Sequence, residues 1–148
     1  VFHDLFGHVP LLFNPVFADY MQAYGAGGLK ASRLEACETL ARLYWYTVEF
    51  GLIDTPAGLR AYGAGILSSA GELRHSVTSS VPQRIGFDLE RIMRTRYRID
   101  SYQSTYFVVD SFDQLFEATA PDFTPIYRRV AAAGELDADA RLPTDRLF

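Results

Sequence analysis

The chain of 148 residues is long enough for one domain with a hydrophobic core, and 49% of it is hydrophobic against 22% charged. Its formal net charge of -4 argues against a nucleic-acid-binding protein, which would need a basic face. No apolar run approaches the ~18 residues that cross a bilayer, and no signal peptide is visible. The single cysteine, Cys37, cannot form an internal disulfide and fits a reducing compartment. We therefore expect a cytoplasmic protein with no nucleic-acid and no membrane partner.

Helix signals dominate the first half of the sequence. A helix is predicted over residues 14–25, because Asn is a good cap and Pro suits the first helical position. The Gly-rich stretch 25–28 then indicates a loop. A second helix is predicted over residues 32–51, opened by the capping box Ser32-x-x-Glu35 and ended by a glycine.

The second half alternates short helices with two strands. We expect a short helix over 55–62, a tight loop over 63–65 and partial helix over 66–77. Further helices are expected over 87–96, 111–118 and 125–133. Two strands are expected over 97–99 and 106–109, joined by a hairpin through 100–103. The sequence therefore predicts a mainly α fold with a small β-hairpin. One domain would span residues 1–133, followed by a mobile tail over residues 134–148 that has few apolar residues.

Three residues of strong metal-binding types stand out, namely His3, His8 and Glu49. The two histidines are five residues apart, which on an ideal α-helix would turn their rings ~140° away from each other. A break at Gly7 and Pro10 would let the chain swing His8 back toward His3. Glu49 lies in an aromatic stretch, where an unpaired buried carboxylate would cost several kcal/mol. It therefore needs a cation or a proton.

Two imidazoles and one carboxylate can form a facial triad, which leaves three corners of an octahedral ion open for water, oxygen and substrate. This arrangement suits non-haem Fe(II). Two other interpretations stay open. The same triad could bind zinc and activate water in a hydrolase, although the histidine spacing fits that poorly and no separate Glu is placed as a general base. A non-catalytic domain could also hold the three side chains as a structural cluster.

Three blocks of sequence resemble the signature blocks of the pterin-dependent aromatic amino acid hydroxylases, in the family's order and with its intervals. They are His3-Asp-Leu-Phe-Gly-His8-Val-Pro-Leu-Leu, Tyr44-Trp-Tyr-Thr-Val-Glu49-Phe-Gly and Tyr62-Gly-Ala-Gly-Ile-Leu-Ser-Ser-Ala-Gly-Glu72-Leu. The resemblance covers roughly residues 1 to 130 and is strongest to bacterial members that act on phenylalanine. It implies part of the family's catalytic-domain fold, and we expect the natural polypeptide to continue upstream.

The resemblance also implies a role for individual residues. Its iron ligands, which form the catalytic centre, fall on His3, His8 and Glu49, its tetrahydrobiopterin contacts on Tyr44 and Asp4, and its substrate pocket on Trp45, Gly65, Ser68, Glu72 and Ile99. Ile99 matches a position that is Asp in tyrosine hydroxylases and apolar in phenylalanine hydroxylases. The implied reaction converts L-phenylalanine to L-tyrosine with O2, Fe(II) and a tetrahydropterin, in a monomeric protein. Tryptophan or tyrosine hydroxylase of the same family stays an alternative.

Overall fold

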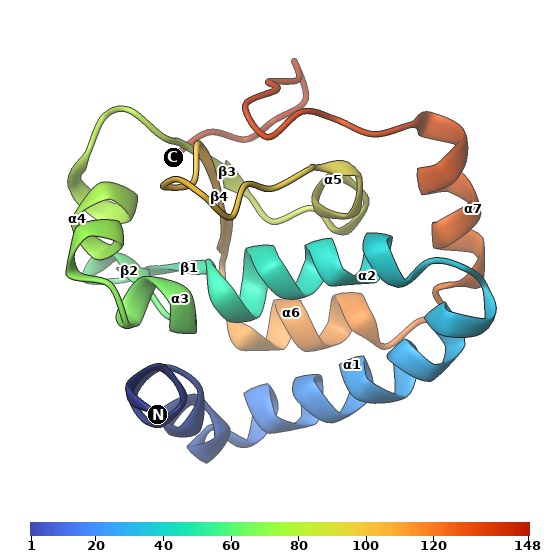
Figure 1. Cartoon of the computed structure of the whole chain (residues 1–148), viewed down its shortest axis with the longest axis horizontal. Coiled ribbons are helices and arrows are strands. Elements are labelled where there is room, and N and C mark those ends of the chain that lie inside the picture. The colour runs from blue at the N-terminus through green and yellow to red at the C-terminus, as the bar shows by residue number, and fades with distance from the viewer.

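The computed structural model describes residues 1–148, and it consists of helices arranged around a small sheet (Figure 1). In chain order the elements are η1 (Asp4–His8), η2 (Val9–Phe13), α1 (Pro15–Arg33), α2 (Cys37–Tyr44), η3 (Trp45–Glu49), β1 (Leu52–Thr55), β2 (Gly58–Ala61), α3 (Ala64–Leu67), α4 (Ala70–Thr78), β3 (Gln83–Gly86), α5 (Leu89–Arg94), β4 (Thr105–Val109), α6 (Phe112–Thr119) and α7 (Thr124–Ala133). None of these helices combines the length and the apolar character that crossing a membrane requires. The mainly α class is confirmed.

The sheet has four strands in the order β2-β1-β4-β3. β1 and β2 form an antiparallel hairpin, whereas β4 runs parallel to both β1 and β3. All five residues of β4 are buried, as expected for a central strand covered on both faces. The predicted hairpin between residues 97–99 and 106–109 is therefore wrong. The second predicted strand exists, but its partners are β1 and β3, and residues 97–99 form no strand.

Helix α1 begins as predicted and ends later than predicted. The Asn14 side chain accepts hydrogen bonds from two N–H groups of the first turn, at 3.0 and 3.2 Å. The stop at Gly25 and the loop over 25–28 are wrong, because the helix continues to its end at Arg33. Each glycine inside a helix costs about 1 kcal/mol relative to alanine. Burial of Ala31, which is 0% exposed in the main core, favours continuing the helix despite that cost.

Two further local predictions are corrected. Ser32 lies inside α1 and Glu35 has a left-handed φ of 53°, so these residues join two helices and do not form a capping box. The short helix expected over 55–62 is the hairpin β1-β2. Gly58, with φ 91°, closes its turn. In β2 exposed residues alternate with half-buried ones, and in β1 only Leu52 is fully buried.

The remaining helices agree with the prediction at their centres. Ser111 caps α6 by accepting a hydrogen bond from the Gln114 N–H at 3.1 Å, and α5 and α7 lie within the predicted ranges to within one residue. The partial helix over 66–77 is two separate helices, α3 and α4. Strand β3 was not predicted.

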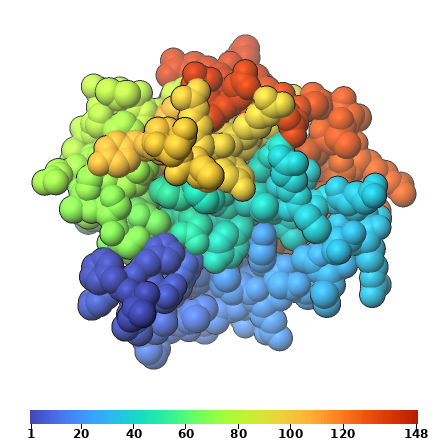
Figure 2. All heavy atoms as spheres, viewed as in Figure 1, coloured from blue at the N-terminus to red at the C-terminus, as the bar shows by residue number.

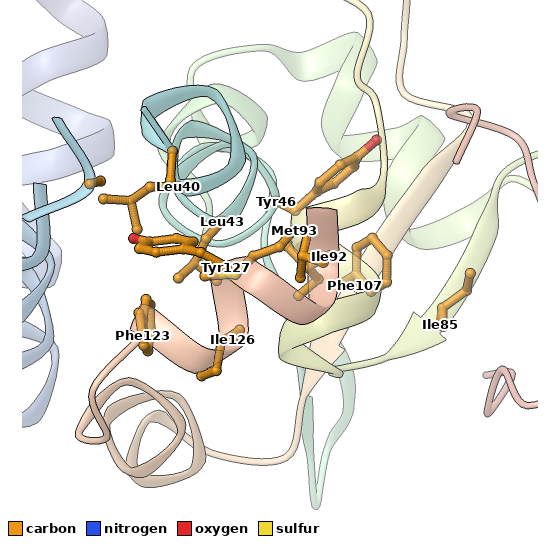
Figure 3. Close-up of a cluster of buried hydrophobic side chains, with 13 residues drawn as sticks. Leu40, Leu43, Tyr46, Ile85, Ile92, Met93, Phe107, Phe123, Ile126 and Tyr127 are labelled. Carbon is orange, nitrogen blue, oxygen red and sulfur yellow. The ribbon is translucent and has the colours of Figure 1, made fainter. Parts of the chain in front are cut away.

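The largest hydrophobic cluster lies between α2, α5, α7 and the sheet (Figure 3). Its fully buried members include Leu43, Ile92 and Met93. Arg42, also on α2, is only 3% exposed, and its guanidinium is paired with Glu38 and Glu135. Helix α2 is thus anchored along its length. Because η3 continues directly from α2, the position of η3 is fixed as well.

Residues 134–148 pack over α5 and the sheet, and they form the upper edge of the molecule in Figure 2. Arg91 pairs with Asp145 at 3.0 Å, with both side chains at most 5% exposed. Burial alone would raise the pKa of Asp145, but hydrogen bonds from Arg91 and from the Leu142 N–H outweigh it and lower this pKa. These contacts give the segment a defined place. The domain boundary at residue 133 and the mobility of the tail stay predictions, which hydrogen exchange of the 134–148 amides would test.

Candidate metal centre

The two histidines of the first block meet because the helix between them is widened. Asp4–His8 is a turn of π-helix, closed by an i→i+5 hydrogen bond from the Val9 N–H. Such a turn brings residues five apart to one face. The Nε2 atoms of His3 and His8 are 3.0 Å apart, and the rings meet edge to face at 85°. The predicted convergence therefore occurs, but through a π turn and not through a break at Gly7-Pro10.

This turn is pressed against α3, which lies directly beside it in Figures 1 and 2. The contact is made at Gly7, which is buried. A Cβ added there would stand 2.7 Å from the Ala64 Cβ and 2.9 Å from the Ala64 Cα, closer than real Cβ contacts allow. Glycine at this position therefore sets how closely the histidines approach the rest of the site.

The third side chain of the cluster comes from a second π turn. In η3 the Phe50 N–H donates to the Trp45 carbonyl at 2.8 Å, again an i→i+5 bond. Glu49, the last residue of this turn, is 15% exposed in its side chain. Its Oε1 lies 3.2 Å from the His8 Nε2 and its Oε2 lies 3.5 Å from the His3 Nε2. One ligand atom from each of the three residues thus lies within 4.8 Å of the others.

These separations fit a single small cation. With bonds of about 2.1 Å, neighbouring ligands are about 3.0 Å apart around an octahedral ion and about 3.4 Å apart around a tetrahedral one. The observed distances of 3.0, 3.2 and 3.5 Å span both values. The donor set of two nitrogens and one carboxylate can therefore hold a divalent first-row metal. The distances alone favour neither geometry.

Hydrogen bonds orient His3 for this purpose. Its Nδ1 lies 2.8 Å from the Ser68 Oγ, and that hydroxyl donates its only hydrogen to the Ala64 carbonyl at 2.8 Å. Ser68 must then accept from His3, so the network assigns the ring proton to Nδ1. The Nε2 lone pair of His3 is left facing His8 and Glu49. Such an outer hydrogen bond typically raises metal affinity.

The residues expected to contact the pterin lie in different surroundings. Tyr44 is the last residue of α2, half-buried, with its ring 6.5 Å from the His8 ring and 5.4 Å from the Tyr24 ring. Burial, and next the Glu49 carboxylate, raise the pKa of Tyr44. Asp4 has a side chain that is 70% exposed. Tyr44 thus borders the triad, whereas Asp4 faces solvent.

The expected substrate residues largely surround one cavity beside the triad. A cavity of about 450 Å³ is lined by Trp45, Phe50, Gly65, Glu72 and the segment Ile99–Gln103. Trp45 stacks on Tyr97 at 4.3 Å and packs against Phe50 at 4.8 Å. Flat apolar walls of this kind suit an aromatic ligand. Ser68 is the exception, because it does not line the cavity and its hydroxyl is committed to His3.

The sequence did not predict five residues of this cavity, namely Phe50, Asp100, Ser101, Tyr102 and Gln103, of which Phe50 and Gln103 are the most buried. Phe50 is one of many aromatic residues in the sequence, and only its place directly after Glu49 sets it apart. Gln103 carried no signal, since a glutamine between Tyr102 and Ser104 suggests an exposed loop. It is only 3% exposed, and its side chain accepts a hydrogen bond from the indole of Trp45.

A family model described as biopterin-dependent aromatic amino acid hydroxylase matches residues 1–129. The chain belongs to this family. The phenylalanine-4-hydroxylase of Ralstonia nicotianae is 68% identical over 147 residues, a match that covers 95% of this chain and 47% of that protein. The phenylalanine-4-hydroxylase of Chromobacterium violaceum is 66% identical, covering 98% of this chain and 49% of that protein. The chain thus spans about half the length of these curated relatives.

Solved structures agree with the sequence matches. The crystal structure of the Chromobacterium violaceum phenylalanine hydroxylase bound to cobalt superimposes with a TM-score of 0.98 at 65% identity, covering 100% of this chain and 53% of that one. The fold of this chain is therefore that of the family's catalytic domain, in part. Membership in a biopterin-dependent family supports a pterin and a metal as cofactors of this chain.

Proposed function

We propose that the protein containing this chain is a phenylalanine 4-monooxygenase that uses Fe(II), tetrahydrobiopterin and O2. The observation that carries the proposal is the convergence of His3, His8 and Glu49 on one point, in a chain 68% identical to a phenylalanine-4-hydroxylase. In the proposed reaction one oxygen atom of O2 enters the phenylalanine ring, to give tyrosine, and the other enters the pterin, which supplies two electrons.

In this proposal the triad holds the iron from one side. Bound Fe(II), together with the tetrahydropterin, would supply the oxygen activation that side chains cannot perform. The protein's own part is to bind and to orient. The single carboxylate of Glu49 leaves a 2+ ion with net positive charge, and Ser68 keeps the His3 lone pair directed at the ion. Tyr44, whose ring faces His8 from the α2 side, is proposed to border the pterin, with Asp4 at its outer edge.

The cavity beside the triad is proposed to bind the amino acid. Trp45 and Phe50 supply flat apolar walls, and Gly65 leaves room, since a Cβ there would stand 2.8 Å from the Phe50 ring. Ile99 would place an apolar group at the mouth, which suits phenylalanine better than a ring that bears a hydroxyl. Glu72 supports the cavity from behind, because its carboxylate accepts hydrogen bonds from the Gln103 N–H and the Tyr106 hydroxyl.

A zinc hydrolase with the same triad is the weaker candidate. Such an enzyme needs a further carboxylate free to act as a base near the metal-bound water. Glu72 is 5% exposed and engaged by two donors, and Asp4 points away to solvent. Neither acid is placed for that role. Bound zinc with peptidase or esterase activity would nevertheless favour this candidate over the oxygenase.

The test is a product assay on the complete protein, with Fe(II) and a tetrahydropterin, offering phenylalanine, tyrosine and tryptophan separately. We expect tyrosine to form from phenylalanine in proportion to bound iron. Preferred turnover of tryptophan or tyrosine would move the assignment to another activity of the family. A protein that binds iron but hydroxylates none of the three would contradict the proposal.

We further propose a monomeric, cytoplasmic protein. The single cysteine of this chain and the reducing conditions that Fe(II) and a tetrahydropterin require support the cytoplasmic location. Light scattering on the purified full-length protein and fractionation of cells would test the two statements. A stable dimer, or recovery of the protein outside the cytoplasm, would contradict them.

A further inference from the structure

Between the half-buried Tyr97 and the buried Gln103, every residue of the segment 98–102 is exposed. Ile99, at the mouth of the cavity, is 80% exposed. The segment belongs to no helix or strand, so no hydrogen-bond ladder fixes its shape. Within the loop only Tyr102 packs on the domain, with its ring 5.2 Å from the His75 ring and its hydroxyl against Gly71 of α4. The rest of an exposed loop of this kind is expected to be mobile unless specific contacts hold it. The position of Ile99 therefore depends on the contacts at the two ends of this loop.

Besides the packing of Tyr102, the hydrogen bonds that hold the loop are made by Gln103. Its side-chain Nε2 donates to the Arg98 carbonyl at 2.8 Å, which closes the loop on itself, and its Oε1 accepts from the Trp45 Nε1 at 3.0 Å. An indole nitrogen only donates and a carbonyl only accepts, so chemistry fixes which way the amide faces. No other arrangement of this side chain satisfies both partners.

The backbone of Gln103 is held as well. Its N–H donates to the Glu72 carboxylate at 3.1 Å, and its carbonyl accepts from the His75 Nε2 at 3.1 Å. Both partners lie on α4. The residue is thus tied through its backbone to the body of the domain and through its side chain to the loop and to Trp45, four residues before the Glu49 ligand. Breaking a buried network of this kind loses more than a single pair suggests.

We propose that Gln103 is a positioning residue for substrate selection: it locks the loop 98–102 to Trp45 and so fixes Ile99 at the mouth of the aromatic cavity. The residue does not line the reacting centre and acts only through Trp45 and the loop. The inference rests on the proposed function, because it assigns the determinant of amino acid binding to that same site. Gln103 is thus expected to affect how tightly the cavity binds the aromatic side chain of the substrate.

Two variants of the full-length enzyme separate the contacts. Gln103→Met keeps the length of the side chain and removes both hydrogen bonds, whereas Gln103→Glu keeps an acceptor for Trp45 and removes the donor to Arg98. We expect Gln103→Met to raise the KM for phenylalanine about tenfold, the loss of roughly one hydrogen bond's free energy, with a smaller change in kcat. Gln103→Glu should raise KM as well, because the loop is released in both variants.

A spectroscopic signature and a core control separate positioning from general instability. In ¹⁵N NMR spectra the Trp45 indole signal, assigned by its loss in Trp45→Phe, should shift and exchange faster in Gln103→Met but be retained in Gln103→Glu. Val130→Ala, a core truncation on α7 with a residue 5% exposed, should lower stability and leave both KM and this signal unchanged. If Gln103→Met fails to fold, Gln103→Asn, which keeps both groups but shortens their reach, takes its place.

A double-mutant cycle with Ile99→Ala completes the test. If Gln103 holds Ile99 in place, Ile99→Ala should change the KM for phenylalanine in the wild-type background and have little further effect in Gln103→Met. An unchanged KM in the Gln103 variants, a KM rise matched by Val130→Ala, or an undiminished Ile99 effect would overturn the proposal. Absence of hydroxylation by the unmodified enzyme would instead contradict the proposed function.

Discussion

Replacing Gly7 with alanine is expected to damage the metal centre through packing alone. The added Cβ would lie 2.7 Å from the Ala64 Cβ, 2.9 Å from its Cα and 3.0 Å from its carbonyl oxygen. Two of these three atoms belong to the backbone of α3, which cannot turn aside as a flexible side chain would. Overpacking of this kind typically costs 1–3 kcal/mol of folding free energy, so we expect about 2 kcal/mol. The φ of Gly7 is not positive, so no backbone strain contributes.

The same displacement should weaken metal binding. If η1 moves away from α3 by a few tenths of an ångström, the 2.8 Å bond between His3 and Ser68 lengthens and the histidine loses its orientation. Loss of such outer support commonly lowers metal affinity 10–100-fold. Urea unfolding of the metal-free protein would give the stability change. Titration with Co(II), followed by its visible absorption, would give the affinity change.

Gly27→Ala is the matched control. Gly27 lies inside α1, and a Cβ there would meet nothing within 4 Å. The same substitution should therefore stabilise the protein by about 0.4–1 kcal/mol and leave metal affinity unchanged. Combining Gly7→Ala with Ala64→Gly should restore only part of the loss, because the Ala64 Cα still stands 2.9 Å away. A Gly7→Ala protein as stable as wild type, with unchanged Co(II) affinity, would refute the packing argument.

Three further perturbations test other parts of the structure. Glu49→Gln removes the only carboxylate of the triad and should abolish iron binding with an unchanged far-ultraviolet circular dichroism spectrum; retained hydroxylation would contradict the ligand assignment. Ser68→Ala should lower metal affinity 10–100-fold, with recovery in Ser68→Thr, which isothermal titration would measure. Asp145→Asn should cost about 3–5 kcal/mol at neutral pH, because it leaves the Arg91 charge buried and unpaired. The pKa of Asp145 is lowered in the folded state, so its stabilisation is present above the ordinary value of 3.8 and lost as pH falls through the folded pKa. The stability gap between wild type and Asp145→Asn should therefore close in acid, and a gap independent of pH would contradict the assignment.

Local chemistry explains which helix ends were predictable. Asn14 and Ser111 cap their helices with their own side chains, so a few neighbouring residues decide the boundary. The false boundary at Gly25 shows the limit of that reasoning. Glycine weakens a helix by only about 1 kcal/mol, and packing of Ala31 against residues far along the chain decides the outcome. No local signal at residues 25–28 carries that information.

The sheet was less predictable because its pairings are not local. Strand β3 pairs with β4 in parallel, joining Ile85 to Phe107 across α5 and an irregular segment. Its residues lack the alternation that marks a strand, since they pass from half-buried to fully buried along its length. Conversely, residues 97–99 have strand-forming side chains but form no strand, and the ring of Tyr97 stacks on Trp45. Tertiary contacts therefore override β-propensity in both places.

The convergence of His3, His8 and Glu49 was predictable from the sequence, but the way in which the three side chains meet was not. Ligand chemistry selected His3, His8 and Glu49, while α-helical geometry placed the two histidines on different faces. The structure resolves the conflict by widening the helix once before His8 and once before Glu49, each time with an i→i+5 bond. A π turn is rarely stable by itself. It occurs where tertiary packing stabilises it, often at functional sites. Here the close contact of Gly7 with α3 and the anchoring of α2 in the core stabilise the two turns, so the geometry of the cluster depends on residues outside it.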